Sequence, residues 1–365
     1  MKIRKEIREN LNQFIQIRRY LHQNPEIGFN TQNTLKYIEH QLNLKSASND
    51  SISGVFYFEG IKPCIAFRCE LDALPIQEKN QFEYKSKNSF MHACGHDAHI
   101  AILIETMRYF MKHKQEHALL FIFQPAEESG AGSKYMIQQN LIEKYDVKEL
   151  YATHVLPNLG NKIGCREGIL MAKSCEIKII MEGKSAHAAH KEKGIDALYA
   201  TNQFLEFIYS LQIEPNILHF GKMTSGEVCN AVSSKAILEG TLRSFDDESF
   251  DFIKTTCVNQ LKEIDEKCKT HSIILFSDGY DLLINDIDLV QKIKLNCKED
   301  YIEVMPMALS EDFSFYTKHC KCCYYFCGLT SHTDLHDSYF DLNEEECLKA
   351  IELNIRLVEN NEFVL

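Results

Sequence analysis

The chain has 365 residues, which is long for a single hydrophobic core and predicts two domains. Its net charge of -12 argues against nucleic acid and against an anionic membrane surface as partners. No run of about 18 or more apolar residues is present, so we expect no transmembrane helix. The charged N-terminal stretch lacks an apolar signal core, which predicts a cytoplasmic protein whose 14 cysteines are reduced thiols.

Helices and strands alternate through the first part of the chain. Apolar residues recur at helical spacing in some segments, and in others they alternate or run continuously. The predicted helices are 3–23, 31–42, 100–111 and 134–144, and the predicted strands are 53–59, 63–69, 119–123 and 150–154. This alternation is typical of the α/β class, with a mostly parallel sheet flanked by helices.

The pattern changes near residue 170. Predicted strands and helices now follow in the order strand, helix, strand, strand, helix, strand: 175–183, 196–212, 217–223, 236–243, 248–270 and 272–277. That order is typical of a ferredoxin-like α+β domain. The helix–strand alternation returns after about residue 279. We therefore predict a catalytic domain built from 1–170 and 279–365, with an inserted lid domain at 171–278.

The stretch MHACGHDAH, residues 91–99, is dense in groups that bind metals. A lone histidine is ordinarily a core residue, but here five potential ligands or ligand partners occur within one short stretch: His92, Cys94, His96, Asp97 and His99. Gly95 permits a tight backbone turn among them. The sequence therefore predicts a metal site at this stretch.

Three further places offer metal ligands. Glu127 and Glu128 follow a buried strand and a proline, His154 ends a strand, and His336 lies in a polar loop. Adjacent glutamates are often solvated, His154 alone would be a core or surface histidine, and spacing does not select His336. Acidic groups also end the strand before the metal stretch, at Glu70 and Asp72, where open α/β sheets place their sites.

These residue types suit a centre that holds two metal ions. A thiolate can bridge two cations while imidazoles and a carboxylate complete open coordination shells. Two metals about 3.5–4 Å apart can share a water and polarise a carbonyl together. A second carboxylate outside the shell can take the water's proton, so adjacent glutamates supply both a ligand and a base. Zinc, manganese and nickel remain alternatives for the metal.

Four cysteines cluster near the end of the chain, at Cys320, Cys322, Cys323 and Cys327. They could form a zinc knuckle, but the spacing is not a paired C-x-x-C pattern. They also run into the apolar stretch CCYYFCGL. We favour a buried strand in which the cysteines are small apolar fillers.

A series of motifs resembles one known family. In order along the chain they are RRYLHQNPEIG, RCELDALP, MHACGHDAH, QPAEE with GAG, THV, GKSAHAA, LEGTLR, SEDFSFY and LHDSYF. They are similar to the amidohydrolase branch of the aminoacylase and carboxypeptidase dimetal metallohydrolases. That branch contains hippurate hydrolases, indole-acetyl-amino-acid hydrolases and N-acetyl-diaminopimelate deacetylases. The resemblance covers nearly the whole chain.

The resemblance implies a role for each catalytic-domain residue. Two divalent metal ions are implied, with Cys94 as the bridging ligand and four further ligands: His96, Glu128, His154 and His336. Glu127 is implied as the general base and then as the general acid toward the leaving amine. Asp72, Asp97 and Glu311, the last in an EDF motif, are implied to support these groups.

The resemblance also implies roles in the lid. His187, which by sequence alone would be a turn histidine, matches a lid histidine that reaches the partner subunit's active site and stabilises the oxyanion. Asn230 matches an asparagine that binds the carboxylate end of the substrate, and Arg243 is a further candidate for that job. A homodimer formed through the lid domain is therefore expected.

The chain departs from the family pattern at three places. Glu70 stands where R-A-D-x-D-A-L-P has its first aspartate. The Pro-His pair after the lid histidine is replaced within Ala189–Glu192. Ser233 replaces the proline that follows Asn230. The two lid changes lie where the acyl-amino acid binds, so they concern substrate identity rather than hydrolysis.

We predict a metal-dependent hydrolase that cleaves the amide of small N-acyl-L-amino acids, with N-acetyl-diaminopimelate as the leading substrate and N-benzoyl amino acids next. The enzymatic alternative is a dipeptidase or carboxypeptidase on the same site. A binding protein on an inactive scaffold is disfavoured because both Glu127 and Glu128 are present. A single structural zinc is disfavoured because a closed site needs about four ligands, fewer than are available.

Overall fold

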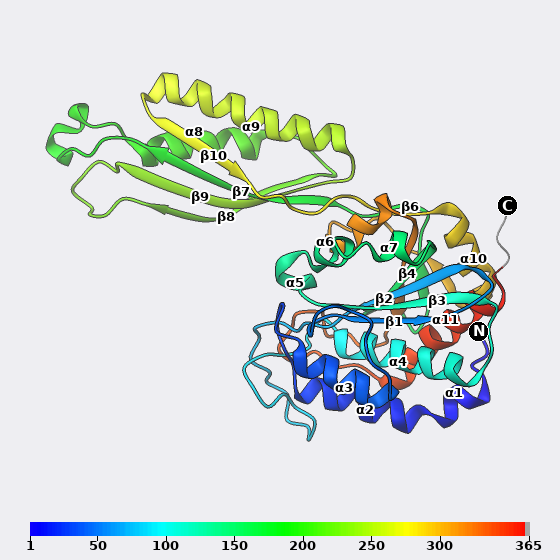
Figure 1. Cartoon of the computed structure of the whole chain (residues 1–365). Coiled ribbons are helices and arrows are strands. Elements are labelled where there is room, and N and C mark those ends of the chain that lie inside the picture. The colour runs from blue at the N-terminus through cyan, green and yellow to red at the C-terminus, as the bar shows by residue number, and fades with distance from the viewer. Residues whose placement is uncertain (362–365) are drawn as a thin grey trace. The chain divides into compact units, whose positions relative to one another are not determined.

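The chain, described here for residues 1–361 from a computed structural model, folds into two compact units (Figure 1). The first unit comprises Met1–Leu170, Ile284–Met305 and the segment from Asp312 onward. The second comprises Met171–Leu283 and Pro306–Glu311. Two short strands, β6 (Gly168–Met171) and β11 (Leu283–Asn285), pair where the chain leaves the first unit and where it returns.

A mixed seven-stranded sheet forms the centre of the first unit. Its strand order is β1-β3-β2-β4-β13-β5-β12. The pairs β2/β3, β2/β4, β4/β13 and β5/β12 are parallel, whereas β1/β3 and β5/β13 are antiparallel. The bounds are β1 Gly54–Phe58, β2 Lys62–Glu70, β3 His117–Gln124, β4 Val147–Leu156, β5 Ile163–Cys165, β12 Tyr301–Glu303 and β13 Lys321–Gly328. The predicted mostly parallel sheet is thus confirmed.

Helices cover both faces of this sheet, as Figure 1 shows. One face carries α2, α3, α4 and α11, and the other carries the short helices α5, α6 and α7. The bounds are α1 Lys5–Glu9, α2 Leu11–Gln23, α3 Gln32–Leu42, α4 His96–Lys112, α5 Glu127–Gly130, α6 Gly132–Ile137, α7 Leu141–Lys144, α10 Ile287–Cys297 and α11 Leu348–Glu359. The helix-flanked arrangement follows from the strands, which are buried on both faces and need apolar cover on each.

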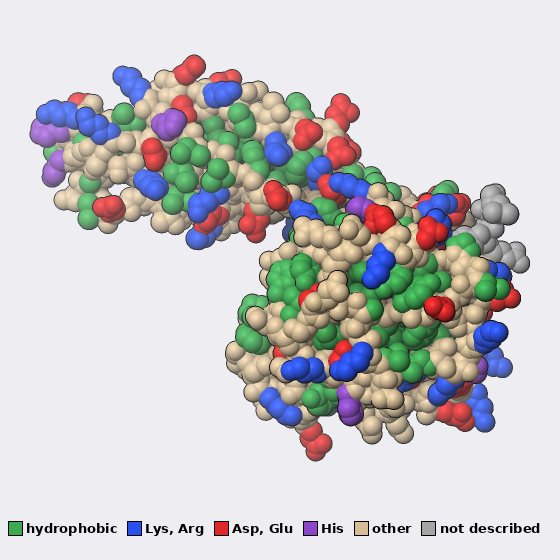
Figure 2. Space-filling model, viewed as in Figure 1, with side chains coloured by type: hydrophobic (Ala, Val, Ile, Leu, Met, Phe, Trp, Pro, Cys, Tyr) green, Lys and Arg blue, Asp and Glu red, His purple; other side chains and the backbone are tan. Residues whose placement is uncertain are grey.

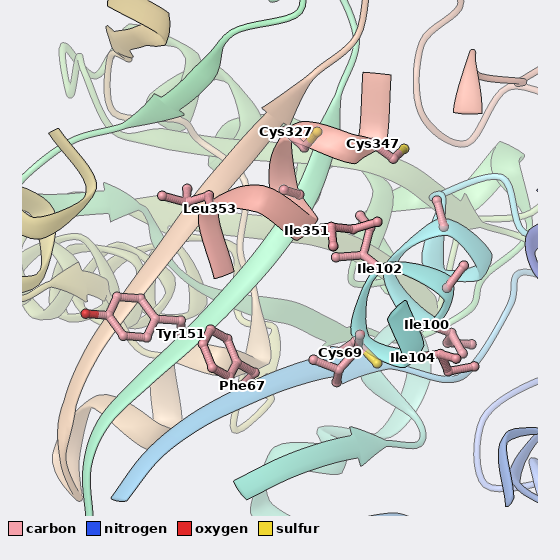
Figure 3. Packing of buried hydrophobic residues seen from close by; sticks show 14 of the residues in the cluster. Phe67, Cys69, Ile100, Ile102, Ile104, Tyr151, Cys327, Cys347, Ile351 and Leu353 are labelled. Carbon is pink, nitrogen blue, oxygen red and sulfur yellow. The ribbon is translucent and has the colours of Figure 1, made fainter. Parts of the chain in front are cut away.

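The core of the first unit lies between the sheet and helices α4 and α11 (Figure 3). Phe67 on β2 stacks against Phe121 on β3 and against Tyr151 on β4, with ring centroids 5.9 Å and 5.8 Å apart. Ile102 from α4 and Leu353 from α11 are buried in the same cluster. This packing holds the strand ends in register, and the strand ends carry the polar site.

Two predicted helices are interrupted. The helix predicted over 3–23 divides into α1 and α2 at Asn10, which is not in the helical conformation. The helix predicted over 134–144 is wrong as a continuous element, because Asn140 adopts a left-handed backbone with φ of 54° between α6 and α7. Asparagine tolerates that conformation better than most residues, so helical spacing alone did not reveal the break.

The second unit contains a four-stranded antiparallel sheet of order β10-β7-β9-β8. Its elements are β7 Lys173–Glu182, α8 Ala197–Ser210, β8 Ile217–Ser225, β9 Lys235–Ser244, α9 Asp247–Cys268 and β10 His271–Phe276. Asp196 caps α8 by accepting hydrogen bonds from two backbone N–H groups. Alternate residues of β7 are buried against the helices, from Cys175 to Met181. The ferredoxin-like order of elements is confirmed.

The clustered cysteines occupy β13, as expected. Cys322, Cys323 and Cys327 are buried in this strand, while Cys320 lies just before it. All 14 cysteines are free thiols. In residues 1–361 there is no helix with the length and apolar character needed to cross a membrane.

Candidate metal centre

The candidate ligands gather at one edge of the large sheet. Asp72 follows β2, Glu127 and Glu128 follow β3 on α5, His154 lies near the end of β4, and His336 lies in the loop after β13. These strands are parallel neighbours, so their carboxyl ends share an edge. The sequence segments are far apart, and the sheet topology brings them together.

The turn of the MHACGHDAH stretch places Cys94 and His96 at this edge. Gly95 has a φ of 83°, and a Cβ there would lie 2.4 Å from Cγ2 of Val155. A glycine is therefore required for both conformation and space. The helix α4 begins at His96 rather than at the predicted Ile100, because the turn ends at Gly95. This start fixes His96 on the first turn of a long buried helix.

Donor atoms from the five predicted ligands lie within a few ångströms of each other. Cys94 Sγ is 3.3 Å from His154 Nε2 and 3.3 Å from His336 Nε2. Glu128 Oε1 is 3.5 Å from His336 Nε2 and 4.0 Å from His96 Nε2. Donors around one tetrahedral zinc, each 2.0–2.3 Å from it, are roughly 3.5 Å apart, so these separations fit metal ligation.

The donors form two groups that share Cys94. One group is Cys94, His96 and His154, and the other is Cys94, Glu128 and His336. Burial, together with the carboxylates of Glu128 and Glu127, raises the pKa of the Cys94 thiol well above its usual range. Carboxylates this close disfavour ionisation of the thiol. Adjacent cations would stabilise the thiolate form.

Two imidazoles are oriented by backbone carbonyls. His96 Nδ1 lies 2.7 Å from the carbonyl oxygen of Asp72, and His154 Nδ1 lies 2.7 Å from that of Val155. Each Nδ1 therefore donates its hydrogen and leaves Nε2 with a free lone pair. Burial lowers the pKa of both histidines, which favours the neutral form that binds metals. His96 Nε2 is buried without a hydrogen-bond partner among the described residues.

Asp72 holds the two glutamates in place. Its carboxylate accepts hydrogen bonds from the backbone N–H of Glu127 at 3.0 Å and of Glu128 at 3.1 Å. Burial raises the pKa of Asp72 to about 7, although these two bonds act in the opposite direction. Because its own carbonyl also orients His96, Asp72 couples the end of β2 to three functional side chains.

The two glutamates differ in their surroundings. Ala126, with a φ of 56°, turns the chain from β3 into α5, and consecutive residues of a helix point in different directions because a turn holds about 3.6 residues. Glu128 Oε1 faces His336 and His96, while Glu127 is 8% exposed and lies next to it. Glu128 therefore lies among the candidate donors, and Glu127 lies beside them.

A buried chain of contacts supports His154 from behind. Arg68 pairs with Glu70, whose second oxygen lies 2.8 Å from His99 Nδ1. His99 Nε2 accepts the backbone N–H of Val155 at 2.9 Å, and the carbonyl of Val155 orients His154. Glu70 and His99 thus contact the backbone next to the candidate ligand His154, which gives the family departure at Glu70 a structural role.

Sequence reasoning missed Asp312. This residue begins the short helix η3 (Asp312–Lys318), is fully buried, and lies 2.5 Å from Arg68 through its Oδ1. Its carboxylate also accepts hydrogen bonds from Gln124 Nε2 and from the backbone N–H of Ser133 at 2.9 Å. Its neighbour Glu311, which was singled out instead, is a buried residue at the end of the second unit's short segment. Because Glu311 and Asp312 are adjacent acidic residues, the sequence alone does not show which of them forms the buried contacts.

The N-terminal motif also contributes residues that sequence reasoning left unassigned. Arg18 Nε and His22 Nδ1 lie 2.9 Å and 2.7 Å from Asp97 Oδ2. Burial opposes ionisation, but Arg18 and His22 hold the pKa of Asp97 well below its usual range. The imidazole that Asp97 orients is therefore His22. His92 is buried, and burial lowers its pKa to about 3, so it is neutral.

His336 is the most exposed of the five candidate ligands. About half of its side chain is accessible, against 1% for His96. Its φ is 66°, and its backbone N–H donates to the carbonyl of Ala93 at 2.8 Å. One backbone hydrogen bond thus ties the loop after β13 to the stretch that carries Cys94.

The predicted lid residues lie in the second unit at two separate places. His187 and Asn230 are exposed neighbours, because the N–H of Ala188 donates to the carbonyl of Asn230 at 2.9 Å. Figure 2 shows histidine and basic side chains gathered at the end of this unit where β7 runs into the following loop. Arg243 lies near the far end of β9 and donates to the carbonyl of Ala308. From Lys235 to Arg243 a strand spans roughly 26 Å, so Arg243 and Asn230 do not share a site within this unit.

Neutral imidazoles, a thiol and paired carboxylates at the carboxyl edge of a mostly parallel sheet define a metal-dependent hydrolase. The profile of Peptidase family M20/M25/M40 matches residues 66–360, so the chain belongs to that family. It is a metal-dependent amidohydrolase, as the motif resemblance predicted.

Curated relatives are similar to this chain over nearly their whole length, and a solved structure shares its fold. An N-acetyldiaminopimelate deacetylase of Brevibacillus brevis is 32% identical over 94% of this chain and 96% of its own length. One of Ligilactobacillus salivarius is 30% identical over 93% and 94%. The fold is similar to that of a Bacillus subtilis protein described as a dinuclear metal-binding peptidase of the M20 family, with a TM-score of 0.84, 24% identity, and coverage of 97% of this chain and 100% of the other.

Proposed function

We propose that the protein hydrolyses the amide bond of small N-acyl-L-amino acids, with an N-acetylated diaminopimelate as the leading substrate. The observation that supports this proposal is the placement of Glu127 beside five converging side chains that could hold metal ions. The support for the substrate class comes from the relatives at 30–32% identity that are named for N-acetyldiaminopimelate. The products would be a carboxylic acid and a free amino acid.

Two divalent metal ions are part of the proposal. Cys94 would be shared between them, with His96 and His154 on one and Glu128 and His336 on the other. The grouping of these donors and the unpartnered Nε2 of His96 fit that assignment. The ions would supply Lewis acidity for a carbonyl and would activate a water. Thiolate and imidazole donors suit zinc, while manganese and nickel remain alternatives.

Glu127 would move the protons. Its carboxylate lies next to the ligand Glu128, and its backbone is fixed by Asp72. From there it would take a proton from the attacking water as general base and deliver it to the leaving amine as general acid. A buried setting suits this role because little bulk water competes for the proton.

Glu127→Gln tests this role, because it keeps size and hydrogen bonding but removes the base. We expect turnover of N-acetyl amino acids to fall by about 10²–10⁴-fold while metal content stays unchanged. Glu116→Gln, an exposed glutamate paired with Lys62, is the matched control and should keep full activity. A panel that includes dipeptides reports the alternative activity. Normal turnover by the Glu127 variant would refute the assignment.

We further propose that the protein is a homodimer in which His187 of the lid acts at the partner's catalytic centre and stabilises the oxyanion, while Asn230 holds the substrate's carboxylate. Both side chains are exposed, which supports a role in contact with another molecule. Mixing inactive His187→Ala with inactive Glu127→Gln should restore part of the activity if subunits exchange. Mixed dimers, verified by mass, that stay inactive would contradict action across subunits.

A further inference from the structure

We infer that a polar pocket in the second unit binds a zwitterionic amino-acid group at the far end of the substrate. The inference rests on the proposed function and specifies its substrate class. The pocket, of about 240 Å³, lies between the turn at Ser185 and the hairpin that joins β8 to β9. One water molecule takes about 30 Å³ of liquid, so the pocket has room for a group of several heavy atoms.

Two opposite charges line this pocket without partners. Glu227 and Lys235 are both exposed, and neither forms an ion pair within residues 1–361. Elsewhere on the same sheet the lysines are paired: Lys178 and Lys222 lie 3.3 Å and 2.5 Å from the carboxylate of Glu239. One unpaired cation and one unpaired anion in one cavity are complementary to a ligand group that carries both charges.

Hydroxyl groups complete the lining. Ser225 and Ser233 lie 2.8 Å apart through their Oγ atoms, and Ser233 donates to the carbonyl of Lys235 at 2.9 Å. This pair fixes the backbone that carries Lys235. The hydroxyls of Ser185 and Ser234 line the pocket with no protein hydrogen bond in the described part of the chain, so they are available to a ligand. Ser233 is the residue that replaces the family's proline, so this chain's departure from the pattern builds part of the pocket.

The pocket adjoins the residues proposed to bind the substrate. Ala231 lines it and forms a β-bridge with His187, and Ser185 lies two residues before that histidine. Asn230 precedes Ala231 and accepts the N–H of Ala188. A substrate whose near carboxylate is held at Asn230 would therefore direct a long side chain toward Glu227 and Lys235.

The ligand chemistry follows from this arrangement. Diaminopimelate carries an amino-acid group at each end of a short carbon chain, so acetylation of one end leaves the other zwitterionic. The distal carboxylate would pair with Lys235 and accept hydroxyl hydrogen bonds, while the distal ammonium would pair with Glu227. An N-acetyl amino acid with an alkyl side chain offers neither charge and would leave both groups unused.

The test compares two substrates of equal chain length, N-acetyl-diaminopimelate and N-acetyl-2-aminoheptanoate, in the full-length metal-loaded protein. We expect the wild type to prefer the first in kcat/KM by about tenfold or more, as charged hydrogen bonds of this kind give. Lys235→Met and Glu227→Gln should each reduce that preference several-fold, mainly through KM. The matched surface controls Lys222→Met and Glu263→Gln should keep the wild-type preference.

Each result is decisive. Equal kcat/KM for both substrates in the wild type, or a preference unchanged in Lys235→Met, overturns the pocket assignment while hydrolysis itself stands. Hydrolysis of neither substrate by the wild type overturns the proposed function and the inference with it. Circular dichroism of each variant establishes that the second unit is folded, and the conservative Lys235→Arg should retain most of the preference if a cation is what matters.

Discussion

The two units of the chain carry their functional side chains in opposite ways. In the first unit the candidate site is buried: His96 and Asp72 are about 1% exposed or less, His96 is hydrogen-bonded to the Asp72 carbonyl, and the Asp72 carboxylate accepts the N–H of Glu127 on α5. In the second unit His187 and Asn230 lie on exposed loops beside a hydroxyl-lined pocket. The chemistry is thus set in a rigid interior, while the groups expected to recognise the substrate stand on loops.

This contrast in burial predicts which positions of the chain tolerate substitution. A buried charge network loses several hydrogen bonds with each substitution, whereas an exposed loop residue can be replaced with little structural cost. Of the departures in the lid, Ala189–Glu192 are exposed and can change in this way, whereas Ser233 is buried and hydrogen-bonded. The one departure in the first unit, Glu70, remains a carboxylate and keeps two buried contacts. Specificity is therefore freer to vary than hydrolysis.

Metal removal should show the largest difference between the units. A chelator is expected to abolish activity, and adding back one divalent metal at a time should restore it. Because ligands bind only the folded site, removal should also destabilise the first unit alone. Hydrogen exchange measured by mass spectrometry should speed up in α4 and β4 and stay unchanged in β7 and β9. Equal changes in both units would contradict the assignment of the metals to the first.

Breaking one ion pair in each unit gives the next largest effect. Asp312→Ala removes one of the buried carboxylates that pair with Arg68 and the acceptor of the Ser133 N–H, and should reduce the free energy of unfolding by about 3–5 kcal/mol. Glu239→Ala removes an exposed carboxylate that pairs with two lysines, and no change in the denaturation midpoint is expected. Urea unfolding followed by circular dichroism measures both. Comparable losses of unfolding free energy would contradict the expectation that the buried ion pair stabilises the protein more than the exposed one.

The smallest effect concerns Glu70, a positioning residue that acts on His154 through His99 and Val155. Glu70→Gln keeps the shape but weakens the orientation of that ligand, so metal affinity should fall by about 10–100-fold. Competition with a fluorescent chelator measures the affinity directly. Arg243→Gln, in the second unit, is the control and should leave affinity unchanged. Glu70→Asp should restore part of the loss if the carboxylate's charge is what matters.

The sequence predicted the elements and the ligand stretch because both are local. Five potential ligands lie within residues 91–99, and the strand ends that carry Glu128 and His154 follow from short apolar runs. The supporting contacts were not predictable, since Arg18 meets Asp97 and Arg68 meets Asp312 across long stretches of chain. Such pairs form only when the sheet closes and leave no pattern in spacing. A helix break such as the one at Asn140 depends on the backbone conformation of one residue, which the spacing of apolar residues does not reveal.

Uneven burial around Cys94 has a kinetic consequence. A cation held by His96 and His154 would sit behind buried imidazoles, whereas one held by Glu128 and His336 would lie beside an imidazole whose side chain is about half exposed. Solvent would therefore reach the second cation more readily than the first. We therefore expect one metal position to keep the ion acquired during folding and the other to equilibrate with the surrounding supply.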